Sequence, residues 1–277
     1  MRWNGRRSGN VEDARGGGAG KVVGGGIGAL VIGVIIYLLG GDPSAVMTQI
    51  PSGGEKTEEQ KRVEDVLVDR TKQILAYTED VWDSLFQAHG QTYQKPVLQV
   101  FDFNTESGCG SAGSSTGPFY CPLDQKAYMD LSFFREMEER FGVGGDFPMA
   151  YVIAHEIGHH VQNLLGISDK AQRYMQNASK TEANRMSVKL ELQADFFAGV
   201  WAHHAHRMYD VLEEGDIEEG LNAASAVGDD RLQQQSQGRV VPDAFTHGSS
   251  EQRMYWFKKG FQTGDMNQGD TFNSPGL

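Results

Sequence analysis

The feature that most constrains the fold of this chain is a helical segment that carries two histidines and a glutamate. Residues 150–165 contain no proline, and their apolar side chains fall on one side of a helix. This spacing predicts an amphipathic helix over residues 150–165 with one buried face. The apolar stripe consists of Val152, Ile157, Val161 and Leu164. The same segment holds the pattern H-E-x-x-H as His155-Glu156-Ile-Gly-His159.

Two histidines four residues apart lie on one face of a helix. The Cβ atoms of His155 and His159 are then about 6 Å apart, and both imidazoles can bind one zinc ion. Glu156 points to one side, toward a water molecule on the metal rather than toward the metal itself. The pattern also occurs by chance on ordinary amphipathic helices. The metal interpretation therefore requires a third ligand elsewhere in the chain.

A second long helix, predicted over residues 181–209, supplies that ligand. Glu191 and Asp195 are four residues apart and are flanked by bulky apolar and small residues. A solvated acidic face fits this composition poorly. Glu191 can be the third zinc ligand, which leaves the fourth position for water, as a catalytic site requires. Asp195 can accept the free ring N–H of a zinc-bound histidine and so fix its tautomer.

The net charge is −12, from 25 basic and 37 acidic residues, which argues against a nucleic-acid-binding surface. Residues 1–21 differ from the rest, because they carry five basic and only two acidic side chains. Residues 22–39 follow without any charge. As a helix they would be about 27 Å long, enough to cross a hydrocarbon core of about 30 Å. The sequence therefore predicts a transmembrane anchor over residues 22–39.

A cleaved signal peptide is the alternative for this apolar segment. Its apolar region would be shorter, about 7–15 residues, and a small-residue cleavage site would follow it. The residues after position 39 match such a site poorly. An uncleaved anchor leaves residues 1–21 as a basic cytoplasmic N-terminus and exports the remainder. We therefore expect a single-pass protein of the cytoplasmic membrane, with its catalytic domain periplasmic or otherwise extracytoplasmic.

The rest of the chain divides by composition. Apolar residues at three- and four-residue steps predict a long helix over 59–89. Alternating segments rich in β-formers predict strands over 96–103 and 127–134. We expect an α+β, mostly helical fold, namely a zincin-like metallopeptidase domain with a small sheet, preceded by one transmembrane helix. The expected segments after the anchor are a linker over 40–58, the zinc metallopeptidase domain over 59–264 and a disordered tail over 265–277.

Cys109 and Cys121 are the only cysteines, and a Gly/Ser-rich loop separates them. A zinc site built on this pair would lack further ligands nearby, and the expected export of the domain favours oxidation. We expect a disulfide that closes the loop.

Through these residues, the chain resembles a known family. The pattern H-E-x-x-H followed by Glu191-Leu-Gln-Ala-Asp195 is similar to that of gluzincin metallopeptidases, and the whole chain to about residue 265 resembles the bacterial "putative neutral zinc metallopeptidase" family. The resemblance implies that His155, His159 and Glu191 bind the metal, that Glu156 is the general base and that Asp195 supports a ligand. Further matching segments are Ser107–Gly110, Gly117–Pro122, Ala198–Ala202 and Thr246–Arg253. A metzincin would need glycine and histidine where the chain has Gln162 and Leu165.

Four further histidines are not expected to bind this metal. His160 points about 100° away from His159 on the helix, and His203, His204 and His206 lie too far along their helix to reach the same metal. We expect these four to be surface or packing residues, although His203 and His206 could hold a weak second metal.

His247 precedes an amphipathic segment over residues 254–261, for which Ser249 or Ser250 would be the helix cap. If that segment packs near the metal, His247 can donate a hydrogen bond to the oxyanion of a tetrahedral intermediate. A structural role in the loop is the alternative.

The sequence thus predicts a membrane-anchored zinc metallopeptidase, with one Zn²⁺ per chain and a peptide or protein as substrate. Glu156 would act as general base and His247 as oxyanion donor. The alternative function is a non-catalytic, zinc-stabilised envelope scaffold that binds a partner. An intramembrane protease is excluded, because polar Gln162 and Asn163 stand beside the ligands and the only apolar span is far from them.

Overall fold

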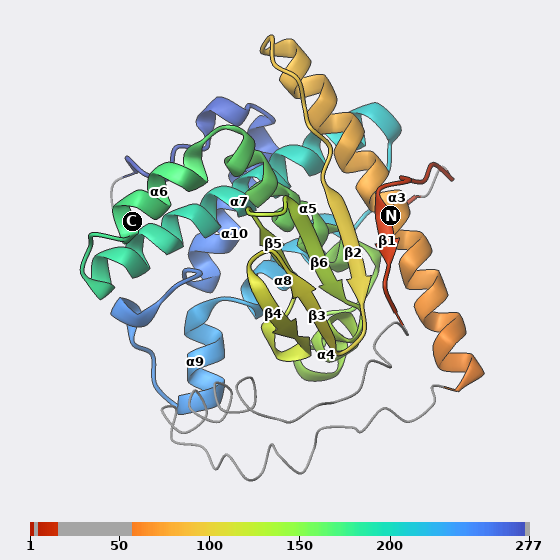
Figure 1. Cartoon of the computed structure of the whole chain (residues 1–277), viewed down its shortest axis with the longest axis horizontal. Helices are drawn as coiled ribbons and strands as arrows, with labels where there is room; N and C mark the ends of the chain where they lie inside the picture. The colour runs from red at the N-terminus through yellow and green to blue at the C-terminus, as the bar shows by residue number, and fades with distance from the viewer. Residues whose placement is uncertain (3–4, 16–56, 275–277) are drawn as a thin grey trace.

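The structure, a computed structural model, describes residues 1–2, 5–15 and 57–274 of the chain (Figure 1). Eight α-helices are described, and they surround a four-stranded sheet and a separate two-stranded sheet. The helices are α3 (Glu58–Ala88), α4 (Ser132–Phe141), α5 (Asp146–Leu164), α6 (Ile167–Met175), α7 (Lys180–Tyr209), α8 (Asp216–Ala226), α9 (Asp229–Gln237) and α10 (Ser250–Thr263). Short 3₁₀ helices are η1 (Ser114–Thr116), η2 (Pro242–Ala244) and η3 (Met266–Gln268). The predicted α+β, mostly helical fold is confirmed.

The four-stranded sheet has the order β1-β2-β6-β5. The first two pairs of neighbours are parallel, and β5 is antiparallel to β6. The strands are β1 (Val11–Asp13), β2 (Val97–Phe101), β5 (Phe119–Cys121) and β6 (Lys126–Asp130). The separate hairpin pairs β3 (Asn104–Ser107) with β4 (Gly110–Gly113). In Figure 1 the sheet lies at the centre, with α3 along its β1 side.

The strand predicted over residues 127–134 is shorter in the structure. β6 ends at Asp130, whose carboxylate accepts a hydrogen bond from the backbone N–H of Ser132 at 2.9 Å. That bond satisfies a free donor at the start of α4, so the chain turns into a helix there. β2 and the long helices α3, α5 and α7 lie where the periodicity predicts them.

Helix ends follow local sequence signals. Thr57, Ser179 and Ser249 each form a capping box with the residue three positions later. Ser249 is thus the cap of α10, one of the two serines predicted for that role. The cap fixes where α10 begins, and the loop that precedes it carries His247.

Helices α7 and α10 cross with their backbones in close contact. A methyl group at Gly199 of α7 would lie 2.1 Å from the carbonyl oxygen of Phe257, and one at Gly260 of α10 would lie 2.0 Å from that of Phe196. Both approaches are far inside van der Waals contact, so only glycine fits at either position. This crossing sets the position of α10 over the central helices.

The N-terminal segment is part of the same body. β1 pairs with β2, and the buried carboxylate of Glu79 on α3 accepts hydrogen bonds from the Ser8 hydroxyl at 2.7 Å and the Asn10 amide at 2.6 Å. Arg7 forms a two-point ion pair with Asp69, also on α3. The segment predicted as a cytoplasmic N-terminus therefore packs on the sheet of the domain predicted to lie outside the cytoplasm.

This packing corrects the predicted topology and localisation. Residues that share one sheet cannot lie on opposite sides of a membrane, so the N-terminal segment and the domain lie on the same side. The anchor predicted over residues 22–39 falls outside the described residues. In the described part of the chain, no helix combines the length and the apolar character that a membrane span requires. The predicted transmembrane helix of the fold class and the predicted single-pass localisation are therefore wrong.

Two further segments can be compared with their predictions. Cys109 and Cys121 form a disulfide, which ties the loop at the end of the β3–β4 hairpin to strand β5. Residues 265–274, part of the tail predicted as disordered, include η3 and pack against α7, where the side chain of Thr271 is fully buried.

The α7–α10 crossing gives a testable prediction for stability. Gly199→Ala should lower the free energy of unfolding by about 1–3 kcal/mol or more, because the added methyl group overlaps the backbone of α10. Thermal and denaturant unfolding measure this change. Gly9→Ala is the control, since no atom lies within 4 Å of that methyl group and the backbone there is ordinary. Equal stability of the two variants would show that α10 can move away from α7 at little cost.

Candidate metal centre

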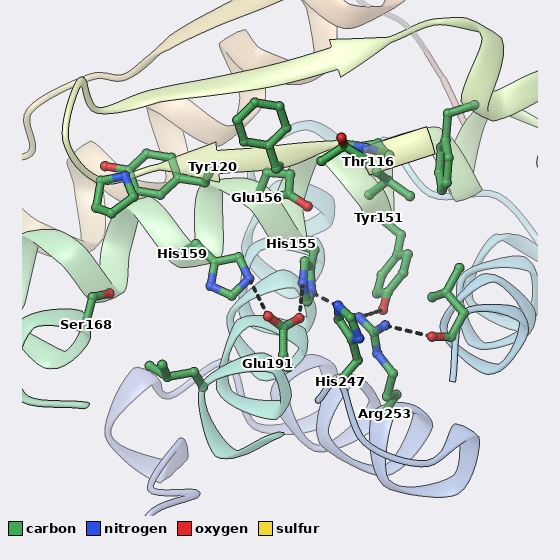
Figure 2. A pocket seen from close by; sticks show the side chains of 18 of the residues that line it. Thr116, Tyr120, Tyr151, His155, Glu156, His159, Ser168, Glu191, His247 and Arg253 are labelled. Atoms are coloured by element: carbon green, nitrogen blue, oxygen red, sulfur yellow. Dashed lines mark hydrogen bonds and ion pairs between the residues drawn. The ribbon is translucent and has the colours of Figure 1, made fainter. Parts of the chain in front are cut away.

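Three side chains on α5 and α7 converge on one point. His155 Nε2 lies 3.2 Å from Glu191 Oε2, and His159 Nε2 lies 3.4 Å from Glu191 Oε1. One ligand atom from each residue can be chosen so that all lie within 4.8 Å of one another. Figure 2 shows the two rings and the carboxylate facing each other across this point. The structure thus brings together the three residues that the sequence predicts as metal ligands.

A glycine within the motif lets the two helices approach. Gly158 of α5 lies against α7, where a methyl group would be 2.9 Å from the backbone oxygen of Ala194. Helical glycine costs about 1 kcal/mol relative to alanine. Here the cost is offset, because close contact of the helices places Glu191 opposite the histidines.

His155 is held by a buried charged network. Its Nδ1 lies 2.8 Å from Asp195 Oδ1, which also accepts from the Tyr151 hydroxyl at 2.5 Å. Arg253 on α10 donates to both carboxylate oxygens, at 2.8 and 2.9 Å. Burial alone would raise the pKa of Asp195, but the charge of Arg253 and the interaction with His155 lower it to about 2. An ionised Asp195 accepts a hydrogen bond from the Nδ1–H of His155 and leaves Nε2 free for a metal.

His159 is held by a neutral partner instead. Its Nδ1 lies 2.8 Å from Gln162 Oε1. The amide N–H₂ of Gln162 donates to the backbone oxygen of Leu190 at 2.7 Å and to Gln193 Oε1 at 3.1 Å. Because both acceptors fix the amide orientation, Gln162 must present its oxygen to His159. The Nδ1 of His159 therefore donates, and Nε2 again points to the metal position.

Glu156 lies beside this cluster and is buried. Burial raises the pKa of its carboxyl group, an effect that the neighbouring histidines oppose. In Figure 2 its carboxyl group lies below strand β5, on the side of the cavity opposite Glu191. A carboxylate with a raised pKa is suited to accept a proton near neutral pH.

The cluster opens into a cavity of about 590 Å³. Glu156 and the three candidate ligands line it together with His247 and Arg253, and apolar side chains form much of the wall. This volume lies within the range of small-molecule ligand pockets. The apolar wall residues include Pro118, Phe119, Phe133, Val152, Met175, Leu190 and Leu232.

His247 lies at the wall of this cavity, as the sequence predicts, but it is not part of the three-ligand group. Asp229, at the start of α9, holds its loop by accepting backbone N–H bonds from Thr246 and His247, both at 2.6 Å, and from Gly248 at 3.1 Å. The ring Nδ1 of His247 lies 3.3 Å from Asp229 Oδ1, and this interaction raises the pKa of His247. The ring is thereby oriented at the cavity by a residue that the sequence analysis missed.

His160 faces away from the metal position, as predicted. Its Nε2 donates to the backbone oxygen of Gln94 at 2.6 Å, so its Nδ1 accepts from the Tyr120 hydroxyl at 2.9 Å. Asn163 donates to the same hydroxyl oxygen at 3.2 Å. These bonds attach strand β5, which borders the cavity, to α5. Burial lowers the pKa of His160, which keeps the ring neutral in this role.

The histidines near the end of α7 serve packing. His203 Nδ1 lies 2.8 Å from the backbone oxygen of Phe261, and His204 Nε2 lies 2.7 Å from that of Gly264. They satisfy carbonyl groups at the C-terminal end of α10. The Nδ1 of His206 accepts a hydrogen bond from the backbone N–H of Leu212 at 3.3 Å. These contacts are those of packing residues, the role that the sequence predicts for them.

The sequence is similar to known proteins over most of its length. The family model described as "Putative neutral zinc metallopeptidase" matches residues 1–272. "Uncharacterized protein YpfJ" of Escherichia coli (strain K12) is 51% identical over 284 residues, which cover 98% of this chain and 99% of that protein. "Uncharacterized protein Mb2605" of Mycobacterium bovis is 45% identical over 207 residues, which cover 71% of this chain and 68% of that protein. No solved structure matches the chain. Because the family model spans nearly the whole sequence, the chain belongs to the family of putative neutral zinc metallopeptidases.

Proposed function

We propose that this protein is a gluzincin-like zinc peptidase that hydrolyses peptide bonds with one zinc ion per chain. The observation that carries the proposal is the position of Glu156, a buried carboxyl group in the same cavity as His155, His159 and Glu191. A site that only stabilised the fold would have no need of a free carboxyl group or of an adjoining cavity.

The family name implies zinc, and the donor set fits it. Two imidazole nitrogens and one carboxylate form a known catalytic zinc set, which leaves one coordination position open. Both imidazoles have Nδ1 bound to an acceptor, so that both Nε2 atoms are available. Zinc at such a position polarises a carbonyl group and lowers the pKa of a water molecule.

The chain's own residues then have distinct tasks. Glu156 is placed to take a proton from the attacking water and to pass it to the leaving amine. His247, oriented by Asp229, can donate its other ring N–H to the oxygen that becomes negative during attack. Asp195 and Gln162 keep the two candidate ligands in the tautomer that binds metal. The apolar wall of the cavity favours a peptide with apolar side chains next to the cleaved bond.

The metal ligands can be tested by zinc content. His155→Ala, His159→Ala and Glu191→Ala should each abolish stoichiometric zinc binding, because each removes one of three protein ligands. Elemental analysis after dialysis against metal-free buffer measures the occupancy, with His206→Ala as the control outside the site. Full occupancy in Glu191→Ala would remove Glu191 from the ligand set.

The general base can be tested by an isosteric change. Glu156→Gln should retain zinc and the melting temperature but lower kcat by about 10²–10⁴-fold, since only proton transfer is lost. Cleavage of a peptide library by the purified protein provides the substrate for this assay, and Glu251→Gln, an exposed position on α10, is the matched control. A wild type that cleaves no peptide, and whose cellular role survives Glu156→Gln, would instead favour the non-catalytic scaffold.

His247 can be tested by separating kcat from KM. An oxyanion donor acts mainly in the transition state, so His247→Ala should lower kcat by about 10²–10³-fold with little change in KM. Zinc content and melting temperature should stay close to wild type. Loss of zinc in this variant would make His247 a ligand, and normal turnover would assign the oxyanion to another group.

A further inference from the structure

The C-terminal segment, residues 265–274, is attached to the turn of α7 that carries Glu191. The hydroxyl of Thr271 donates to the backbone oxygen of Lys189 at 2.6 Å, and the ammonium group of Lys189 donates to the backbone oxygen of Phe272 at 2.9 Å. Thr271 is fully buried. Two hydrogen bonds therefore join the segment to this part of α7. One runs from Thr271 to Lys189, and the other runs from Lys189 to Phe272.

From the same segment, a chain of amide hydrogen bonds leads to the metal position. Gln193 donates from Nε2 to the backbone oxygen of Gly269 at 2.8 Å. Its Oε1 accepts from Gln162, and Gln162 Oε1 lies 2.8 Å from Nδ1 of His159. A backbone carbonyl can only accept, so Gly269 determines which end of Gln193 faces Gln162. That choice in turn reinforces the orientation of Gln162 toward His159.

The position of Gly269 is fixed by packing. A methyl group there would lie 2.5 Å from Cδ1 of the buried Phe196 ring. The segment thus packs directly on the ring. This packing holds the carbonyl oxygen of Gly269 at Gln193. Gly269 has an ordinary negative φ, so close packing rather than backbone conformation is what requires glycine.

We propose that residues 265–274 are a positioning element of the metal centre, which acts on His159 through Gln193 and Gln162. The proposal rests on the metal site of the proposed function but not on peptidase activity. His155 has an anionic partner that is itself fixed by Arg253, whereas His159 has only a neutral amide. Neutral amides can rotate between two orientations, and the second one would present N–H₂ to His159. The backbone oxygen of Leu190 already opposes that orientation, and the segment adds a second, fixed acceptor through Gln193. Together they keep the second histidine ready to bind metal.

Two variants test this idea from opposite ends. Gln193→Met keeps the volume of the side chain but breaks the amide chain, while Gly269→Ala leaves every amide side chain intact and forces the segment away from Phe196. Losing the direct partner of a metal ligand weakens metal binding by about 10–100-fold. Both variants keep that partner, Gln162, so they should weaken zinc binding at the low end of this range, by about 10-fold. Competition with a chelator, well below the melting temperature of every variant, measures the affinity. Gln235→Met, on the exposed side of α9, is the matched control and should bind zinc as wild type does.

A second measurement separates positioning from general stability. Co²⁺ added alone, at saturation, gives a visible absorption spectrum that reports the geometry of the ligands. Altered spectra in Gln193→Met and Gly269→Ala, with an unchanged one in Gln235→Met, would support the proposal. Lower melting temperatures of the metal-free variants, combined with unchanged zinc affinity and an unchanged Co²⁺ spectrum, would overturn it. A wild type that binds no zinc would overturn both this inference and the proposed function, whereas failure of the variants alone leaves the proposed function standing.

Discussion

The buried ion pair between Asp195 and Arg253 is the interaction on which the site depends. Arg253 comes from α10 and Asp195 from α7, and the same carboxylate binds Tyr151 and His155 of α5. Removing one member of such a pair leaves an uncompensated buried charge, at a cost of about 3–5 kcal/mol. Three helices from separate parts of the sequence are thus fixed at one carboxylate, and the glycine contacts between α7 and α10 let the arginine reach it.

Much of the site could be predicted because helical geometry determines which nearby residues lie on the same face of a helix. The four-residue spacings of His155 with His159, and of Glu191 with Asp195, place each pair on one face before any tertiary contact is known. Tyr151 lies four residues before His155, and Gln162 lies three residues after His159, so helical spacing also places them beside the ligands. Every helical residue has neighbours at these spacings, however, so the spacing alone did not single them out. Arg253 and Asp229 have no local signal, because their partners lie far away in sequence and are known only from the fold.

The fold was predictable for long periodic segments and less so elsewhere. β5 consists of three residues between two prolines, too few to show alternation. Residues 1–21 were assigned to the cytoplasm from their charge and from the apolar segment after them. Polar side chains in the described part of this segment nevertheless match acidic partners on α3. Charge composition cannot distinguish a membrane-flanking segment from one that pairs with an acidic surface. The C-terminal segment has few apolar residues, and its order comes from backbone carbonyls bound by Lys189 and Gln193.

The strand pairing of the N-terminal segment also has a consequence for the order of folding. Val11 lies opposite Leu98 in the β1–β2 pair, so the contact closes a long loop of chain. Such contacts form slowly, because the chain loses conformational entropy on closing the loop before the strand pairing can stabilise it. The helices that carry the metal ligands are close in sequence and can associate early. The N-terminal segment is therefore among the last parts to form its native contacts, after α3 and β2 have folded.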